Sequence, residues 1–471
     1  MDRKPQFTHG GIEHATINGH RFHLRRNDPI RENLLWIDGQ SPPLVLDRVA
    51  SDFVSLIIEA MWQFQQGEGD ESEQVRQFVV DRMHEKYGRH GIRRVLALAR
   101  RPTRERIRAD LDRIFGTLLC IANGTCPAET GLGMKPIDHT KWIAPARIDF
   151  AVTYQCNLDC GKCYLGCDKQ GMPELPAEEC VKVFEALWKI GVPQIVFTGG
   201  EPTCRKDLVR LVGEAEEFVT GLVTNGTMLA GLAKDLRAAS LDFVQVTLES
   251  HNPVTHNQMV GAAFDAWSDT VEGIRKALGA GLQVVTNTTL TTDNSAGFLE
   301  LLRFGKALGL KDMACNDLIC SGRGTEARKS KGLDTEDLKE ILIEAVEVAR
   351  GLGINLQWYT PTCYEKLNPL ELGFGAKACS AAAHNMTIEP DGSVLPCQSW
   401  PEPVGNVLRD PWERIWNHPV CRKLRQHGFA HETDACRKCT HVNVCGGGCP
   451  LERELQHEGT KARRHQGEQL T

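Results

Sequence analysis

The pattern of apolar and polar positions divides the chain into three stretches, and the middle one is the most regular. From about residue 146 to 350, short apolar runs alternate with amphipathic stretches. The runs predict six strands, at 147–153, 194–199, 221–225, 242–249, 282–290 and 312–319. Apolar strands that alternate with helices are typical of a parallel sheet. Six such units predict a partial (β/α)6 barrel, an α/β fold open on one side, with its chemistry on the loops after the strands.

Residues 1–135 follow a different pattern. The stretches "TINGHRFHLRR" (16–26) and "ENLLWIDG" (32–39) predict two short strands with turn residues between and after them. Apolar residues at helical spacing then predict three amphipathic helices, around 50–61, 75–83 and 107–118. This order predicts a small α+β domain of winged-helix character. The Gly- and Pro-rich segment 125–142 is typical of a linker.

In the last stretch, from about 361 to 455, apolar periodicity fades and cysteines dominate. They are Cys363, Cys379, Cys397, Cys421, Cys436, Cys439, Cys445 and Cys449. So many thiols with so little apolar pattern predict a domain stabilised by metal. Cys421 lies in a helical pattern, where a structural role is expected, and residues 456–471 are expected to form a solvated tail.

Composition narrows the function classes. The 471 residues are 41% hydrophobic and 25% charged, with a net charge of −6. There is no basic excess to favour nucleic acid, and no apolar run approaches the ~18 residues that span a membrane. The N-terminus lacks the apolar region of a secretory signal, so we expect a cytoplasmic protein. In that compartment the 18 cysteines are reduced, and clusters of them indicate metal ligands rather than disulfides.

Three of the cysteines, Cys156, Cys160 and Cys163, are spaced C-x3-C-x2-C directly after the first predicted barrel strand. Three thiolates are one fewer than a closed 4Fe–4S cluster requires, which leaves one iron open to a substrate or cofactor. The alternative is a structural zinc site. Zinc favours four ligands in C-x2-C pairs, which this spacing fits poorly.

This spacing at this position resembles the signature of the radical S-adenosylmethionine (SAM) superfamily, whose members have a partial TIM-type barrel. The resemblance implies that the open iron binds SAM and that reduction of the cluster releases a 5′-deoxyadenosyl radical. It also implies a reductant such as flavodoxin or ferredoxin. One position departs from the family: Lys162 stands where an aromatic residue or histidine is usual, which puts adenine stacking there in doubt.

Three further segments resemble the SAM contacts of that family. "FTGGEPT" (197–203) matches its Gly-Gly-Glu-Pro motif, in which glycines let the backbone approach the cofactor and carbonyls or the glutamate take the methionyl ammonium. "VTLES" (246–250) matches its fourth-strand segment, and "CSGRG" (320–324) follows the sixth strand. The resemblance implies that SAM is bound by Gly199, Gly200, Glu201, Pro202, Glu249, Ser250 and Asn287.

The C-terminal cysteines resemble the SPASM extension, which holds two auxiliary iron–sulfur clusters; zinc ribbons are the alternative. The resemblance assigns Cys379, Cys397 and Cys449 to the first cluster, with Cys363 or no residue as the fourth ligand. It assigns Cys436, Cys439 and Cys445 to the second. The family pattern ends with one more cysteine, which this chain lacks. His457, His465, a carboxylate such as Asp434 or an external ligand could complete that cluster.

The element order of residues 1–135 resembles the winged-helix recognition domain of RiPP maturases, where a leader peptide adds a strand to the sheet edge. A packing or dimerisation domain is the alternative. Together these features predict a radical SAM oxidoreductase that gives a peptide a thioether or carbon–carbon crosslink or an oxidised side chain. Alternatives are a haem-type cofactor precursor or a sulfatase-like protein as substrate. An electron carrier or zinc-stabilised adaptor is disfavoured by the Gly-Gly-Glu-Pro segment.

Overall fold

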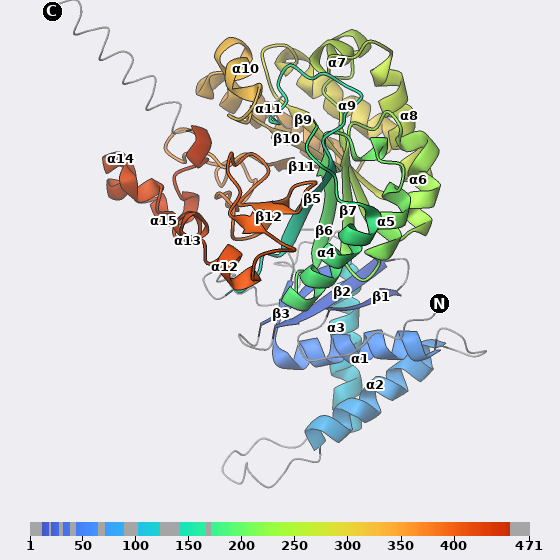
Figure 1. Ribbon diagram of the computed structural model, residues 1–471. Helices are drawn as coiled ribbons and strands as arrows, with labels where there is room; N and C mark the ends of the chain where they lie inside the picture. Colours follow the sequence, from blue (N-terminus) through green and yellow to red (C-terminus); the bar gives the residue numbers. More distant parts are fainter. Residues whose placement is uncertain are drawn as a thin grey trace, which may run out of the picture. The chain divides into compact units, whose positions relative to one another are not determined.

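A computed structural model describes residues 12–17, 20–27, 32–37, 44–64, 71–88, 102–122, 142–165 and 171–452. The chain forms two compact units (Figure 1). Unit 1 comprises Met1–Lys141 with Glu217–Val219, and unit 2 comprises Trp142–Glu216 with Thr220–Thr471. No helix among the described residues is long and apolar enough to cross a membrane.

Unit 1 is an antiparallel sheet of strand order β1-β2-β3-β4 with three helices. The elements are β1 (Ile12–Ile17), β2 (His20–Asn27), β3 (Glu32–Ile37), β4 (Leu44–Leu46), α1 (Arg48–Phe64), α2 (Glu71–Gly88) and α3 (Arg104–Ala122). The three predicted helices are present. The prediction of two strands is wrong, because the first predicted stretch contains the end of β1 and most of β2, and β4 lies outside both stretches.

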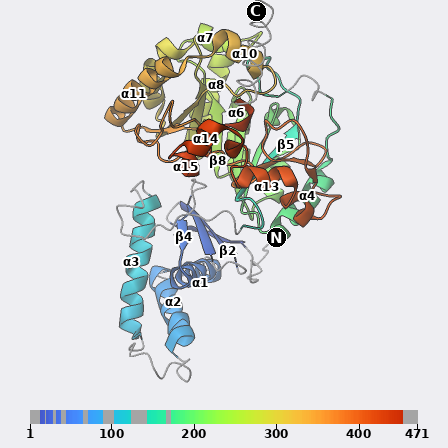
Figure 2. The same ribbon diagram turned by 90° about the vertical axis from the view of Figure 1, so that its left-hand side faces the viewer.

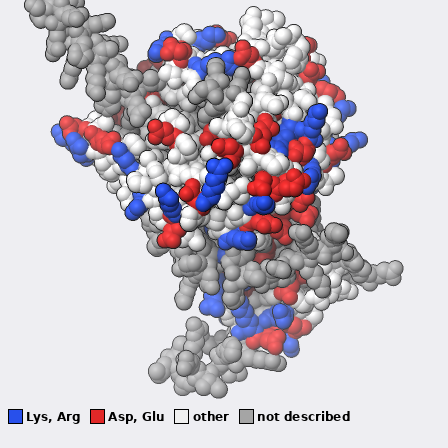
Figure 3. Space-filling model, in the orientation of Figure 1, with Lys and Arg blue, Asp and Glu red and all other residues white. Residues whose placement is uncertain are grey.

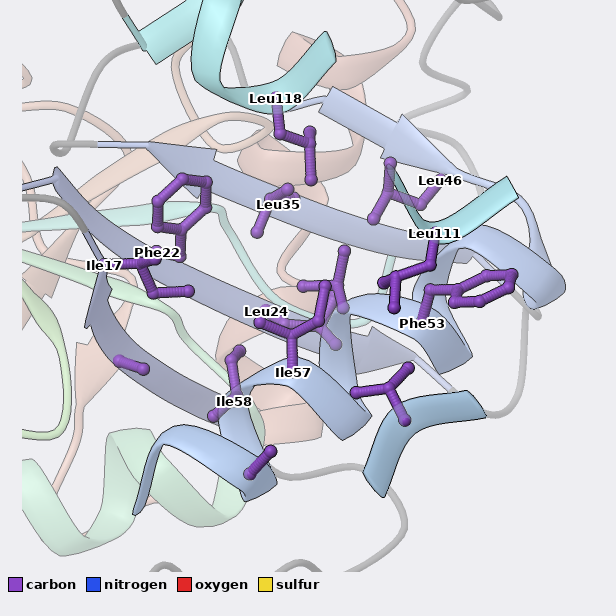
Figure 4. Packing of buried hydrophobic residues seen from close by; sticks show 14 of the residues in the cluster. Ile17, Phe22, Leu24, Leu35, Leu46, Phe53, Ile57, Ile58, Leu111 and Leu118 are labelled. Carbon is purple, nitrogen blue, oxygen red and sulfur yellow. The ribbon is translucent and has the colours of Figure 1, made fainter. Parts of the chain in front are cut away.

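The core of unit 1 lies between one face of this sheet and the helices (Figure 4). Phe22 and Leu24 alternate along β2, so both point to the same face, where they meet Phe53 and Ile57 of α1 and Leu111 of α3. All five side chains are at most 4% exposed. Unit 1 therefore has a hydrophobic core of its own.

Unit 2 is built on one ten-stranded sheet of order β11-β10-β9-β8-β7-β6-β5-β12-β13-β14. Its strands are β5 (Arg147–Thr153), β6 (Gln194–Gly199), β7 (Val219–Thr224), β8 (Phe243–Thr247), β9 (Gln283–Thr289), β10 (Asp312–Asn316), β11 (Asn355–Trp358), β12 (Asn385–Ile388), β13 (Ser393–Leu395) and β14 (Gly405–Asn406). The first six confirm the predicted strands. The sheet is open, as expected, and β11 and β12 extend it with parallel pairings to β10 and β5.

The helices that alternate with these strands lie along the outside of the sheet (Figure 1). They are α4 (Ala177–Ile190), α5 (Leu208–Glu214), α6 (Leu229–Ala238), α7 (Pro253–Met259), α8 (Ala266–Gly279), α9 (Phe298–Leu308), α10 (Gly324–Lys331) and α11 (Thr335–Leu352). Residues 148–153 of β5 are all buried, so both faces of this strand are covered. Along β8 and β9 buried and half-buried residues alternate, so one face of these two strands is less covered than the other.

The cysteine-rich region is joined to the barrel through this sheet. Its strand β12 pairs with β5 of the barrel, β13 pairs with β12, and β14 pairs with β13. The helices α12 (Trp412–Trp416), α13 (Pro419–Arg425), α14 (Asp434–Lys438) and α15 (Val442–Cys445) follow (Figure 2). Cys421 is fully buried on α13, in agreement with its expected structural role. The predicted boundary between residues 350 and 361 falls inside unit 2 and stays a prediction.

The charged side chains of unit 2 show no segregation by sign on the face seen in Figure 3. Lys and Arg lie among Asp and Glu on this face. Ion pairs of unit 2 include Lys182–Glu179 and Lys276–Glu272. Exposed pairs of this kind contribute little to stability.

Candidate active site

The segment after β5, residues 154–165, is called the cysteine loop here; it carries Cys156, Cys160 and Cys163. The amide of Cys163 donates to the Cys160 carbonyl over 3.2 Å, which forms a tight turn between these two predicted ligands. Burial raises the pKa of Cys160 to about 12, against the opposing effect of the Lys162 charge. Because iron binds the thiolate, metal binding at this residue must also remove a proton from it.

Gly199, the last residue of β6, and Gly200, which follows it, pack directly against the start of the cysteine loop and the residue before it. The amide of Gly200 donates to the Thr153 carbonyl over 2.9 Å, and the amide of Glu201 donates to the Gln155 carbonyl over 2.8 Å. A Cβ on Gly199 would lie 2.0 Å from the Thr153 oxygen, and one on Gly200 would lie 2.5 Å from the Gln155 oxygen. The sequence analysis expected these glycines to approach the cofactor; the structure shows them in close contact with the backbone that presents Cys156.

We therefore expect Gly200→Ala to displace the cysteine loop. The new methyl group meets backbone rather than a flexible side chain, so residues 154–156 must shift. A misplacement of about 1 Å at a reacting centre can lower a rate about 10²-fold. The measurements are iron content and the rate of SAM cleavage. Gly231→Ala on α6 is the matched control, because nothing lies within 4 Å of its Cβ position. Wild-type iron content and rate in Gly200→Ala would contradict this role.

Glu201 is fully buried, and both of its carboxylate oxygens accept hydrogen bonds from protein. Oε1 accepts from the Thr203 amide at 3.0 Å and the Thr224 hydroxyl at 2.7 Å, and Oε2 accepts from the Asn225 amide at 2.7 Å. Burial raises the pKa of Glu201, whereas these donors lower it. The carboxylate thus joins the end of β6 to the end of β7. Pro202 begins the short 3₁₀ turn η4 (Pro202–Cys204) beside it.

Lys162, the residue that departs from the family pattern, forms a buried ion pair with Glu249 after β8. Its Nζ lies 2.5 Å from Glu249 Oε1, and the two side chains are 13% and 1% exposed. Glu249 Oε2 accepts from the Thr289 amide at 3.0 Å, so strand β9 also holds this carboxylate. The ion pair links the middle of the cysteine loop to the carboxyl ends of β8 and β9.

A buried histidine lies next to this ion pair. The amide of Glu249 donates to Nδ1 of His256 over 3.2 Å, so that nitrogen carries no proton. Burial and the Lys162 charge lower the pKa of His256 to about 4. The ring is therefore neutral with its proton on Nε2, which has no partner among the described residues.

The opposite side of the cysteine loop is held by two further segments. A Cβ on Gly261, after α7, would lie 2.2 Å from the Asp159 carbonyl, and one on Gly322, after β10, would lie 2.7 Å from the Leu165 carbonyl. Arg323 forms an ion pair with Asp159. The "CSGRG" segment thus contacts the cysteine loop.

The remaining predicted SAM contacts, Ser250 and Asn287, differ in their surroundings. The Ser250 hydroxyl accepts from the Asn252 amide at 3.1 Å within a buried turn. Asn287 donates through Nδ2 to Asn316 at 2.9 Å, and its Oδ1 has no partner within the described part of the chain. It lies on the half-buried face of β9. All seven predicted SAM contacts stay predictions, and Asn287 retains an acceptor with which to make one.

The cysteines assigned to the first auxiliary cluster come from three separate segments. Burial, followed by the neighbouring Cys379 and Cys449 thiols, raises the pKa of Cys397 to about 12. The structure therefore brings these three thiols within electrostatic range of one another. Cys363 approaches with its backbone: a Cβ on Gly448, next to Cys449, would lie 3.2 Å from the Cys363 amide nitrogen.

The cysteines assigned to the second cluster lie on or next to two short helices: Cys436 on α14, Cys439 directly after it, and Cys445 at the end of α15. Backbone amides donate to their sulfurs, from His441 to Cys439 over 3.4 Å and from Gly447 to Cys445 over 3.1 Å. Such N–H···S bonds are a recognised influence on iron–sulfur clusters. Neither of these two amides donates to the sulfur of the third cysteine, Cys436, which lies one turn before Cys439.

The candidates for the missing ligand of the second cluster have different outcomes. Asp434 forms an ion pair with Arg437 and its side chain is 82% exposed, whereas His457 and His465 lie outside the described residues. The His441 amide lowers the pKa of Cys439, whereas burial and a carboxylate that the sequence analysis did not consider, that of Glu365, raise it. No spacing signal could have identified Glu365, because it lies in a different segment of the chain.

A single metal ion has no ready site in this arrangement: no three His, Cys, Asp or Glu side chains in the described ranges come together closely enough to hold one. A 4Fe–4S cluster makes a different demand, since each of its thiolates binds a separate iron and the ligands surround the cluster. The thiol-only donor sets and the sulfur-directed amides fit such a group.

Comparison with known families agrees with these donor sets. Residues 150–305 match the model of the radical SAM superfamily, and residues 379–440 match that of the iron–sulfur cluster-binding domain SPASM. The chain contains a radical SAM domain and a SPASM domain. It is an enzyme whose cofactors are a 4Fe–4S cluster with SAM and auxiliary iron–sulfur clusters. The radical SAM match covers the cysteine loop, and the SPASM match extends from Cys379 to beyond Cys439.

Individual proteins to which this chain is similar differ in their reactions. Pre-heme d1 synthase of Dinoroseobacter shibae is 27% identical over 339 residues, which cover 65% of this chain and 82% of that one. PqqA peptide cyclase of Granulibacter bethesdensis is 28% identical over 316 residues, 63% of this chain and 80% of that one. The structure of Streptococcus suis SuiB bound to precursor peptide SuiA matches with a TM-score of 0.62 at 16% identity. That match covers 93% of this chain and 96% of SuiB, and shows a shared fold.

Proposed function

We propose that this enzyme modifies a ribosomally made peptide, which unit 1 recruits through a leader segment. The observation that carries the proposal is the extent of the likeness to SuiB. The part of this chain left out of that match, 7% of 471 residues or about 33 residues, is smaller than unit 1. At least part of unit 1 is therefore included in the match to SuiB, whose structure contains a precursor peptide.

The relatives found by sequence match a smaller part of the chain than SuiB does. Matches that cover 63–65% of this chain, about 300 of 471 residues, can be accommodated within unit 2. They include both a peptide cyclase and enzymes of haem synthesis. Unit 2 is thus compatible with either substrate class, and unit 1 is the feature that favours a peptide.

The sheet of unit 1 has two edges to which a peptide strand could be added. β1 and β4 are the outer strands, of six and three residues. The indole nitrogen of Trp62 donates to the His14 carbonyl over 2.7 Å, so one group of β1 is already satisfied. An added strand gains affinity from main-chain hydrogen bonds and specificity from alternate side chains.

In unit 2 the chain's own residues would hold the cofactors and position the cysteine loop. The cluster with SAM, when bound, supplies a 5′-deoxyadenosyl radical that takes a hydrogen atom from the substrate. Cys156, Cys160 and Cys163 would hold that cluster, and the neighbouring segments fix the cysteine loop at the carboxyl ends of β6, β8, β9 and β10. The proposed product carries a thioether or carbon–carbon crosslink, or an oxidised side chain. We place the reaction in the cytoplasm, where thiols stay reduced and a flavodoxin or ferredoxin can serve as reductant.

The test is substrate turnover. Reconstituted, reduced enzyme is incubated with SAM and, separately, with short peptides encoded beside its gene and with a porphyrin precursor. We expect one of the peptides to lose hydrogen, as seen by mass spectrometry, with 5′-deoxyadenosine formed alongside. Modification of the porphyrin and of none of the peptides would favour the second candidate function, haem-type synthesis, which the pre-heme d1 synthase relative supports.

Removal of unit 1 tests the leader site separately. A chain that begins at Trp142 keeps the cysteine loop and the SPASM cysteines, so we expect it to cleave SAM at nearly the full rate. Modification of the full-length precursor should fall by about 10²-fold or more, because the leader no longer holds the core peptide at high effective concentration. Unit 1 added as a separate polypeptide is the control and should restore little. Soluble, cluster-loaded truncated enzyme that modifies its precursor at the full rate would exclude this role.

A further inference from the structure

The segment after β10 lies between the cysteine loop and the SPASM region. Its serine, Ser321, has a hydroxyl 3.1 Å from the Tyr164 carbonyl and 3.1 Å from the Ser399 carbonyl, and donates to one or the other. Tyr164 follows Cys163, and Ser399 is two residues after Cys397. The residue before this serine is Cys320, which none of the sequence motifs assigned to a cluster.

A second set of contacts ties the same segment to the region of Cys449. Arg328 of α10 forms ion pairs with Asp317 and with Glu452, the latter at 3.4 Å. Asp317 precedes Cys320 by three residues, and Glu452 follows Cys449 by three residues. The side chains of Arg328 and Asp317 are 23% and 8% exposed, so this connection is largely shielded from water.

The electrostatic effects on the Cys320 thiol are consistent with this placement. Burial, the Glu452 carboxylate and the Cys449 thiol raise the pKa of Cys320 to about 11, although Arg328 acts in the opposite direction. The Cys379 and Cys449 thiols act on Cys397 in the same way, so electrostatic effects connect these four thiols through Cys449. Three of them are the predicted ligands of the first auxiliary cluster.

We propose that Cys320, from the barrel, is the fourth thiolate ligand of the first auxiliary cluster, with Cys379, Cys397 and Cys449. This set of four satisfies every iron of a 4Fe–4S cluster. The cluster then has no open iron for a substrate, and its contribution is electron transfer and the attachment of the SPASM region to the barrel. Cys363, the fourth ligand considered from the sequence, becomes a residue near the cluster rather than a ligand of it.

The test compares Cys320→Ala with Cys363→Ala in full-length enzyme. Both are made in a background with alanine at Cys156, Cys160 and Cys163, so that only auxiliary clusters contribute. On mild oxidation we expect Cys320→Ala to lose about one iron per chain and to gain a 3Fe–4S signal in electron paramagnetic resonance, relative to the background. Cys363→Ala should match the background. An unchanged Cys320→Ala, or the loss in Cys363→Ala alone, would overturn the proposal.

A conservative variant covers the case in which Cys320→Ala loses the whole cluster. Cys320→Ser offers an oxygen ligand in the same place, so the cluster should persist with altered g-values and a shifted reduction potential. A structural thiol that never contacts iron would leave both quantities unchanged in Cys320→Ser. That result would overturn the assignment, whatever the alanine variant does.

Discussion

Alanine at Cys156, Cys160 and Cys163 together is expected to reduce SAM cleavage to the rate of a control without enzyme. The three thiols are the predicted cluster ligands on the cysteine loop, and no cysteine of the C-terminal segments lies on that loop. Iron content should fall by about four per chain, the content of one 4Fe–4S cluster, while the auxiliary iron remains. The measurements are 5′-deoxyadenosine by chromatography and iron by colorimetric assay.

The matched control for this variant is Cys180→Ala. Cys180 is buried on α4 and its thiol contacts the Leu175 carbonyl at 3.6 Å, so its replacement perturbs packing without touching the cysteine loop. It should keep both iron and SAM cleavage. Continued formation of 5′-deoxyadenosine by the triple variant would mean that the open iron belongs to another set of cysteines.

The strands of unit 2 could be predicted where the local pattern was strong. β5 and β6 are buried along nearly their whole length and appear in the sequence as predominantly apolar runs. By contrast, β12 has four residues, and what defines it is its pairing with β5, more than 200 residues earlier. Local periodicity carries no information on such a partner.

The candidate site likewise contains features that the local sequence could predict and features that depend on the fold. The cysteine spacing could predict the cluster ligands, because metal chemistry fixes the number and type of donors. The role of the glycines in "FTGGEPT" could be predicted only as close approach; that the approached group is the Thr153–Gln155 backbone required the fold. Lys162 was recognised as a departure from the family, but its partner Glu249 lies 87 residues away. Pairings over that distance follow from the sheet order.

The second large effect is the loss of stability expected when the Lys162–Glu249 ion pair is broken. Lys162→Met leaves the buried Glu249 carboxylate without its cation, and Glu249→Gln leaves the Lys162 ammonium without its anion. Loss of one partner of a buried pair costs about 3–5 kcal/mol, because the remaining charge is neither hydrated nor neutralised. We therefore expect both single variants to melt at lower temperature and to retain less iron on the cysteine loop. The surface variant Lys182→Met is the control, since its partner Glu179 is 36% exposed and such pairs contribute about 0–1 kcal/mol.

The double variant Lys162→Met/Glu249→Gln separates a structural role from direct contact with SAM. With both charges removed, no unpaired ion remains, so the loss of stability should be smaller than the sum of the two single losses. If the pair only positions the cysteine loop, iron content and SAM cleavage recover together, and the KM for SAM stays near the wild-type value. Recovery of iron with a KM that remains raised would show that Lys162 or Glu249 also touches SAM. Additive losses of stability in the double variant would contradict the ion pair itself.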